Sequence, residues 1–185
     1  MEQKKWSSPE KAWKGIVSEY PKEFFELFFP KAAKNIDFSK PITFLEGVLE
    51  KIEPAYKMPG TAGELLFKAS VQDKKEQEIL FHLIILGSKP NYFYVDLYYT
   101  EFILKEEALK QLPMPLVMLI DTDPEFYPKK AEIYSDFFPE TLHLETAKLL
   151  YMEEQLAGEN SLLAECIRVQ MTVSRLHEKL HGDNA

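Results

Sequence analysis

The chain contains one cysteine, Cys166, among its 185 residues, and its seven glycines are scattered. A single thiol cannot form an internal disulfide, so we expect a reducing, cytoplasmic environment. Scattered glycines exclude a glycine-rich phosphate-binding loop. No stretch approaches the roughly 18 apolar residues of a membrane span. No apolar segment follows the N-terminal lysines, as a signal peptide would require. We therefore expect no membrane partner.

Basic residues are also scarce. The chain has 22 lysines and arginines against 30 acidic residues, a net charge of −8. Residues 1–40 hold 8 lysines and 6 acids, a net charge of +2, while the 14 basic and 24 acidic residues of 41–185 give −10. Nucleic-acid binding draws most of its affinity from neutralisation of phosphates by basic side chains. The charge therefore argues against a nucleic-acid partner and favours an acidic, solvated surface.

The motifs of nucleophilic catalysis are missing. There is no Gly-x-Ser-x-Gly sequence and no paired Cys and His. Cys166 lies in an apolar helical pattern, which favours a buried structural thiol. His82 has apolar neighbours and is expected to be a hydrogen-bonded interior residue, and His143 has no motif partner. His177 and His181 have the i, i+4 spacing that can hold a metal, but we expect them to be solvated.

The length and composition fit one domain, residues 1–185, that is large enough to bury a substantial core. The 13 Phe and 9 Tyr predict a core built on aromatic rings. Several segments bounded by proline or glycine have apolar residues at helical spacing, and one long segment is mostly free of glycine and proline. They predict helices that open at Ser8 and Pro21, and helices over residues 41–53, 91–112, 146–156 and 161–177.

Strand patterns separate these helices. Residues 64–71 and 78–86 predict two strands joined as a hairpin, after a turn at residues 59–63. Residues 116–120 form an uninterrupted apolar run, typical of an interior strand buried on both faces, and residues 141–144 predict a further strand. The order of elements predicts a single-domain α/β fold with a mixed central β-sheet flanked by helices.

Several stretches together resemble a bacterial protein family. They are FFELFFP at residues 24–30, NIDFS at 35–39, FLE at 44–46, LFK at 66–68, LFH at 80–82, LIDTDPEFYP at 119–128 and KLL at 148–150. No single stretch is specific, but their succession over residues 20–170 is similar to that of Rpn-type recombination-promoting nucleases and transposase-related cytosolic proteins. These belong to the PD-(D/E)XK nuclease superfamily. The resemblance implies a restriction-endonuclease-like core of order α-β-β-α-β.

Such nucleases need carboxylates to hold Mg²⁺, which polarises the scissile phosphate and activates a water. The superfamily takes one acid from the first hairpin strand. The next strand supplies an acid and a Lys or Gln two residues apart. Residues i and i+2 of a strand point to the same face, so both reach the metal. An acid on the preceding helix often assists.

The resemblance assigns these positions to residues that mostly lack the required chemistry. Glu64 stands at the first acidic position. Ile84 takes the second acidic position and Leu86 the Lys or Gln position, and neither can bind a hard cation or orient water. Val48 takes the position of the helix acid, with Glu46 nearby. Glu64 alone would hold Mg²⁺ weakly, because such sites need several oxygen ligands. We therefore expect no cofactor.

Two other features offer candidate sites. Asp121 and Asp123 follow the apolar strand and could hold a metal, but Asp before proline commonly caps an Asx turn, which we expect here. An aromatic run contains Tyr92, Phe93, Tyr94, Tyr98, Tyr99 and Phe102. It could stack nucleic-acid bases or form a protein interface. Few basic residues accompany the run, so we expect a helix face packed on the sheet.

Three functions remain open. The one we favour is a catalytically degenerate nuclease-like protein, a non-enzymatic binding or structural module that self-associates or binds a protein partner. The second is an active Mg²⁺-dependent DNA endonuclease whose metal ligands have migrated to Glu46, Glu64, Asp121 or Asp123. The third is a small-ligand or regulatory module that uses the former active-site cleft as an apolar pocket.

Overall fold

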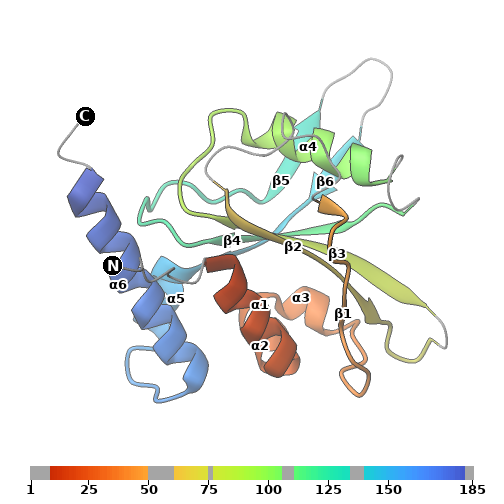
Figure 1. Cartoon of the computed structure of the whole chain (residues 1–185), viewed down its shortest axis with the longest axis horizontal. Coiled ribbons are helices and arrows are strands. Elements are labelled where there is room, and N and C mark those ends of the chain that lie inside the picture. Colours follow the sequence, from red (N-terminus) through yellow and green to blue (C-terminus); the bar gives the residue numbers. More distant parts are fainter. Residues whose placement is uncertain (1–8, 50–60, 75–76, 106–110, 134–139, 182–185) are drawn as a thin grey trace, which may run out of the picture.

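The structure is a computed structural model, and it describes residues 9–49, 61–74, 77–105, 111–133 and 140–181. A five-stranded mixed sheet crosses the domain, with helices against both of its faces (Figure 1). The predicted α/β fold with a mixed central sheet and flanking helices is confirmed. Within the described residues, no helix is both long enough and apolar enough to cross a membrane.

Five strands build the sheet, and they lie in the order β1 (Thr43–Phe44), β2 (Thr61–Ser70), β3 (Glu78–Leu86), β4 (Met114–Leu119) and β7 (Glu145–Lys148). The first three are antiparallel neighbours, whereas β3, β4 and β7 run parallel. A parallel pair needs a crossover connection. Between β3 and β4 that connection contains the helix α4 (Phe93–Ile103).

One face of the sheet is covered by α1 (Pro9–Glu19), α2 (Pro21–Phe28), α3 (Pro30–Ala33), α5 (Leu149–Gln155) and α6 (Leu162–His181). Strand alternation points Phe81, Leu83 and Ile85 of β3 to this face, and all three are fully buried. The ring centroid of Phe25 in α2 lies 5.3 Å from that of Phe81. The predicted aromatic core is therefore present between the helices and the sheet.

The opposite face of the sheet is covered by α4, and a two-stranded ribbon of β5 (Lys130–Ile133) and β6 (Glu140–His143) lies beside that helix (Figure 1). The alternate residues of β3 point this way. Ile84 and Leu86 pack against Leu97 of α4. Because β3 is buried on both faces, its sequence is a continuous apolar run rather than an alternating one.

The predicted helix over residues 41–53 is wrong in its described part. Residues 43–44 instead form β1, where Phe44 lies opposite Phe67 of β2. The two ring centroids are 5.6 Å apart, and this contact outweighs the helical spacing of the apolar residues. Gly47 then has a φ of 72°, a left-handed conformation that interrupts a helix. The segment from residue 50 lies outside the described residues.

The C-terminal part also differs from the prediction. The helix predicted over residues 146–156 begins only at Leu149, because the preceding residues form β7, parallel to β4.

Strand β5 and helix α3 have no predicted counterpart, since each is four residues long and shows no clear periodicity. Thr61 lies in β2 rather than in the predicted turn. Leu112 lies in no helix, so α4 is shorter than predicted.

Candidate functional site

Strands β2 and β3 carry the positions where the resemblance places a nuclease site. Glu64 lies directly opposite Ile84 in the antiparallel register. Because side chains alternate along a strand, His82, Ile84 and Leu86 point to the same face of the sheet as Glu64. This is the face that α4 covers. The register therefore brings the assigned residues together beneath one helix.

Ile84 and Leu86 belong to an apolar cluster. Both are 0% exposed, and they pack with Phe93 and Leu97 of α4 and with Phe126, which follows β4. The Phe93 and Phe126 ring centroids lie 5.6 Å apart in an edge-to-face arrangement. A Mg²⁺ site needs oxygen ligands and usually retains several waters. The side chains of this cluster supply no oxygen ligand.

His82 lies between two carboxylates. Its Nδ1 is 2.7 Å from Oε1 of Glu101 in α4, and its Nε2 is 3.6 Å from Oε2 of Glu64. The first contact is a hydrogen bond, and the second is an ion pair beyond hydrogen-bond distance. His82 is 0% exposed and Glu101 1% exposed, whereas 17% of the Glu64 side chain is exposed. The cluster reaches solvent through Glu64.

The two carboxylates determine the protonation of His82. Burial alone would lower the pKa of His82, because it disfavours the charged imidazolium. The charges of Glu101 and Glu64 outweigh burial and raise this pKa from 6.5 to about 10. Burial raises the pKa of Glu101, although the charge of His82 opposes the shift. At neutral pH the site holds an imidazolium between two carboxyl groups.

This arrangement suits structure better than catalysis. A general base works best when its pKa lies near the operating pH. The pKa of His82 lies well above 7, and its side chain is fully buried. A protonated imidazole also has no free lone pair for a metal. Among the residues that the structure describes, no group of three or more His, Cys, Asp and Glu side chains could hold a metal ion. The predicted role of His82 as a hydrogen-bonded interior residue is confirmed.

Glu101 is the member of this cluster that the sequence interpretation missed. Phe93, Leu97 and Glu101 follow one another at four-residue spacing in α4. Residues four apart share one side of a helix, so a helix that buries Phe93 and Leu97 also directs Glu101 to the sheet. A buried carboxylate needs a partner. The sequence signal for Glu101 would have been His82, the one ionisable residue within the apolar part of β3 and therefore the natural partner for a buried carboxylate.

The position assigned to the helix acid lies in a turn after β1. Glu46 forms an ion pair with Lys14 of α1, and 75% of its side chain is exposed. The hydrogen bond and charge of Lys14 lower the pKa of Glu46. Val48 packs against Leu66 and Leu80. Glu46 therefore has its partner on α1, away from the His82 cluster.

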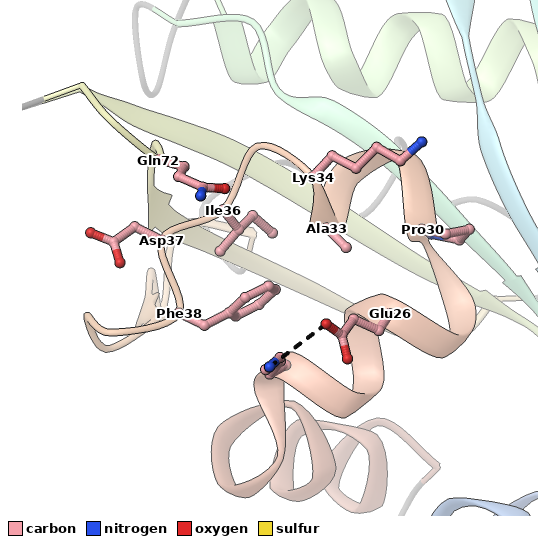
Figure 2. A pocket seen from close by; sticks show the side chains of 9 residues that line it. Glu26, Pro30, Ala33, Lys34, Ile36, Asp37, Phe38 and Gln72 are labelled. Atoms are coloured by element: carbon pink, nitrogen blue, oxygen red, sulfur yellow. Dashed lines mark ion pairs between the residues drawn. The ribbon is translucent and has the colours of Figure 1, made fainter.

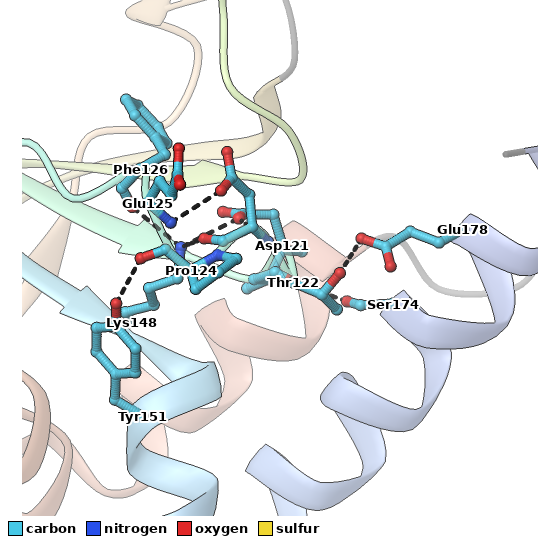
Figure 3. Close-up of polar contacts among 11 residues, drawn as sticks. Asp121, Thr122, Pro124, Glu125, Phe126, Lys148, Tyr151, Ser174 and Glu178 are labelled. Carbon is cyan, nitrogen blue, oxygen red and sulfur yellow. Dashed lines mark hydrogen bonds and ion pairs between the residues drawn. The ribbon is translucent and has the colours of Figure 1, made fainter. Parts of the chain in front are cut away.

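The loop after β4 contains the Asx turns that we predicted. Oδ1 of Asp121 accepts the backbone N–H of Asp123 at 2.9 Å, and Oδ1 of Asp123 accepts that of Glu125 at 2.8 Å. Lys148 of β7 enters the same loop (Figure 3). Its Nζ lies 3.1 Å from Oδ1 of Asp121 and donates to the carbonyl of Phe126 at 3.0 Å. Lys148 is 2% exposed as a residue, and its ammonium supplies the positive charge beside Asp121.

Helices α5 and α6 also hold this loop (Figure 3). The Tyr151 hydroxyl of α5 donates to the carbonyl of Pro124 at 2.6 Å. The Thr122 hydroxyl donates to the carboxylate of Glu178 in α6. The loop is thus tied to three elements, and Oδ1 of Asp121 and of Asp123 each accept a hydrogen bond within it.

The remaining candidates gather at no common site. The prediction of a buried thiol is wrong in its burial, because Cys166 of α6 is only half-buried. Burial together with the charge of Glu165 raises the pKa of the Cys166 thiol, which disfavours the reactive thiolate. His177 lies exposed on α6, as predicted. The side chains of His143 and His181 lie outside the described part of the structure.

Most rings of the aromatic run are exposed to solvent rather than packed on the sheet as predicted. Phe93 is buried and Tyr98 half-buried, but four rings are exposed: Tyr92 by 71%, Tyr94 by 42%, Tyr99 by 51% and Phe102 by 50%. The expectation of a helix face packed on the sheet is wrong for these four. The physical reason is the helical period, since the side of α4 that faces the sheet is already taken by the buried residues described above.

Two cavities open elsewhere on the molecule. The first, of about 540 Å³, lies between α2, α3 and the turn that follows α3 (Figure 2). Its polar side chains include Glu26, Lys34 and Asp37, which carry both signs of charge. The second, of about 410 Å³, lies where Tyr20 and Leu27 approach the start of α6. Neither is lined by the β2 and β3 residues that the resemblance singles out.

Comparisons with known proteins find no match to this chain among family models, curated proteins or solved structures. The resemblance to PD-(D/E)XK nucleases therefore stays a prediction, and it is carried by the residues quoted for it.

Proposed function

We propose that this chain is a catalytically degenerate nuclease-like protein that acts as a non-enzymatic binding module. One observation carries the proposal: Ile84 and Leu86, which the resemblance assigns to the positions of the metal acid and the catalytic Lys or Gln, are fully buried. They are core residues beneath α4. An apolar pair at this place removes two of the groups that metal-dependent phosphodiester hydrolysis needs.

The strand order supports the nuclease-like origin in the proposal. The chain runs from helices through the antiparallel pair β2 and β3 to α4, and then to β4, parallel to β3. This is the α-β-β-α-β order that the resemblance implies. Many unrelated proteins share sheets of this kind, so the order agrees with the resemblance and carries no information about activity.

The state of Glu64 supports the loss of catalysis. Its carboxylate lies beside the His82 imidazolium, which already supplies a positive charge. A metal ion at Glu64 would stand close to that imidazolium and meet its repulsion. The one acid retained from the assigned set therefore serves the buried ion-pair cluster.

The surface of α4 supports binding to a protein. Tyr99 and Phe102 are half exposed, and Val95 is 57% exposed. Tyrosine and phenylalanine are enriched at protein interfaces. A binder of single-stranded nucleic acid would combine such rings with a basic groove, whereas this chain has a net charge of −8. A protein partner therefore fits this helix better than a nucleic acid.

The filled core argues against the small-ligand alternative at the same place. Phe93, Leu97 and Phe126 occupy the space above Ile84 and Leu86. An apolar pocket at the former cleft would require these side chains to move away. Since all five are at least nine-tenths buried, we do not adopt that alternative.

A plasmid assay tests the proposal. Purified protein is incubated with supercoiled DNA and either Mg²⁺ or Mn²⁺, alongside the variants Glu64→Gln and Glu159→Gln. Glu159 is an exposed acid remote in sequence from β2 and serves as the matched control. We expect no nicking above the metal-only background for any of the three proteins. Cleavage that disappears in Glu64→Gln but persists in Glu159→Gln would contradict the proposal and establish the endonuclease.

A further inference from the structure

Helix α6 has an apolar stripe in addition to the side that packs on the core. Its core side buries Leu163, Ala164, Ile167 and Met171. A second set of apolar residues lies on the other side of the helix, and we call it the α6 stripe. Its members are Leu162, Cys166, Val169, Val173, Leu176 and Leu180.

The spacing of the α6 stripe is that of a heptad repeat. Successive members are separated by four, three, four, three and four residues, the alternation of a and d positions in a coiled coil. At 3.6 residues per turn they stay within roughly 80° of the helix circumference. The polar residues Gln170 and His177 separate the stripe from the core side. The stripe is therefore a continuous seam.

Five of the six members of the α6 stripe are exposed, and Cys166 is half-buried. The exposed fractions are 51% for Leu162, 62% for Val169, 54% for Val173, 54% for Leu176 and 72% for Leu180. Single exposed apolar residues are ordinary, but a contiguous row marks an interaction site. Helix α6 lies at one end of the molecule (Figure 1). That position lets another chain approach the stripe along its length.

We propose that the α6 stripe pairs with the same stripe of a second copy of this chain, antiparallel and centred on Met171. In this register Leu162 faces Leu180 of the second copy and Cys166 faces Leu176. Val169 then faces Val173. Each contact occurs twice by symmetry, so every member of the stripe meets an apolar residue. A two-fold axis requires this kind of self-complementary surface.

Charge at the edge of the stripe selects the antiparallel direction. The antiparallel register places Glu165 opposite Lys179 of the second copy, and it does so twice. A parallel pair would instead place Glu165 opposite Gln170, with no charge complementarity. Edge positions of this kind set partner and orientation in coiled coils. Glu165 also contacts Arg168 in its own helix at 3.0 Å, yet 66% of its side chain stays exposed and available.

Sedimentation equilibrium over a range of concentrations tests the dimer. We expect the full chain to dimerise reversibly, and Val173→Glu to weaken the dimer by about 100-fold or more, because two unpaired carboxylates would be buried in the seam. Leu112→Glu, at a position 43% exposed and outside both α4 and α6, is the matched control and should leave the dimer unchanged. Far-ultraviolet circular dichroism verifies that each variant is folded. A chain that stays monomeric, or a dimer broken by Leu112→Glu and not by Val173→Glu, would overturn the proposal.

Charge reversal tests the direction. Glu165→Lys and Lys179→Glu should each weaken the dimer, by about 3- to 10-fold for two exposed ion pairs. The double variant Glu165→Lys/Lys179→Glu should recover most of the affinity. Single variants without effect, or no recovery in the double variant, would overturn the antiparallel register.

Disulfide formation gives an independent readout of the same register. Cys166 is the only cysteine of the chain, and in the antiparallel pair it faces Leu176 of the second copy. We expect Leu176→Cys to give a covalent dimer under mild oxidation, and the wild type and Val173→Cys to remain uncrosslinked. Efficient crosslinking through Cys166 in the wild type, or through Val173→Cys, would indicate a parallel pair and overturn the proposal.

Discussion

At the scale of single residues, charges enter the core in pairs. Among the described residues, the four buried charged side chains form two contacts, His82 with Glu101 and Lys148 with Asp121. Removing a single charge from water costs several kcal/mol, and an opposite charge with hydrogen bonds offsets much of that cost. The first pair ties α4 to β3, and the second ties the loop after β4 to β7. Both pairs therefore specify how elements meet.

The raised pKa of His82 predicts a dependence of stability on pH. Below pH 6.5 both the folded and unfolded chains hold the proton, and between 6.5 and about 10 only the folded chain holds it. Stability therefore falls as pH rises through this window, by up to about 1.4 kcal/mol per unit. Urea unfolding at pH 7 and pH 9 should show a loss about 2 kcal/mol larger for the wild type than for His82→Gln/Glu101→Gln, which lacks both titrating groups.

The double variant is the necessary reference, because removing His82 alone would leave the Glu101 carboxyl to titrate without its partner. Equal losses of stability in the wild type and in the double variant would show that His82 is not protonated in the folded chain. The imidazolium between two carboxyl groups would then be refuted.

At the scale of elements, β3 could be predicted to the residue, whereas β1 and β7 could not. The run from Glu78 to Leu86 is long, apolar and bounded by polar segments, so its own composition specifies a strand. Strand β1 has two residues and β7 has four, too few for a period. Their pairing with β2 and β4 decides their conformation, and that information is not local in the sequence.

The candidate site was predictable in part for a similar reason. Glu64, Ile84 and Leu86 were located by resemblance and by strand alternation, and the register places Glu64 opposite Ile84. Glu101 was missed, because its role depends on which side of α4 meets the sheet. The four-residue spacing from Phe93 through Leu97 places Glu101 on the sheet-facing side of α4 only if Phe93 and Leu97 are known to pack on the sheet.

The apolar cluster under α4 predicts that a carboxylate at position 84 would destabilise the fold. Ile84→Glu would bury a carboxylate among Leu97 and Phe126, and we expect the free energy of unfolding to fall by about 3 kcal/mol or more. Val95→Glu, the same type of change at an exposed site of α4, should alter it by less than about 0.5 kcal/mol. Chemical denaturation measures both. A stable Ile84→Glu protein would show that the cluster is open rather than packed.

At the scale of the whole molecule, two helices with exposed apolar surfaces, α4 and α6, lie on opposite faces of the sheet. Helix α4 packs on one face of the sheet and turns its exposed aromatic side away from it, while α6 packs on the other face (Figure 1). A dimer through the α6 stripe would therefore leave α4 accessible on both copies. Two copies of a weak binding surface on one particle raise the apparent affinity for a repeated or dimeric partner. An acidic chain with exposed aromatic rings on α4 fits such a binding role.

Calorimetric titration of the folded protein with Mn²⁺ tests most directly the claim that the metal site at β2 and β3 has become core. The wild type is compared with Glu64→Gln, and with Glu159→Gln as the control. We predict no saturable heat of binding up to millimolar Mn²⁺ in any of the three, since Ile84 and Leu86 supply no ligands and His82 neutralises Glu64. Saturable binding to the wild type that is lost in Glu64→Gln and kept in Glu159→Gln would contradict the claim.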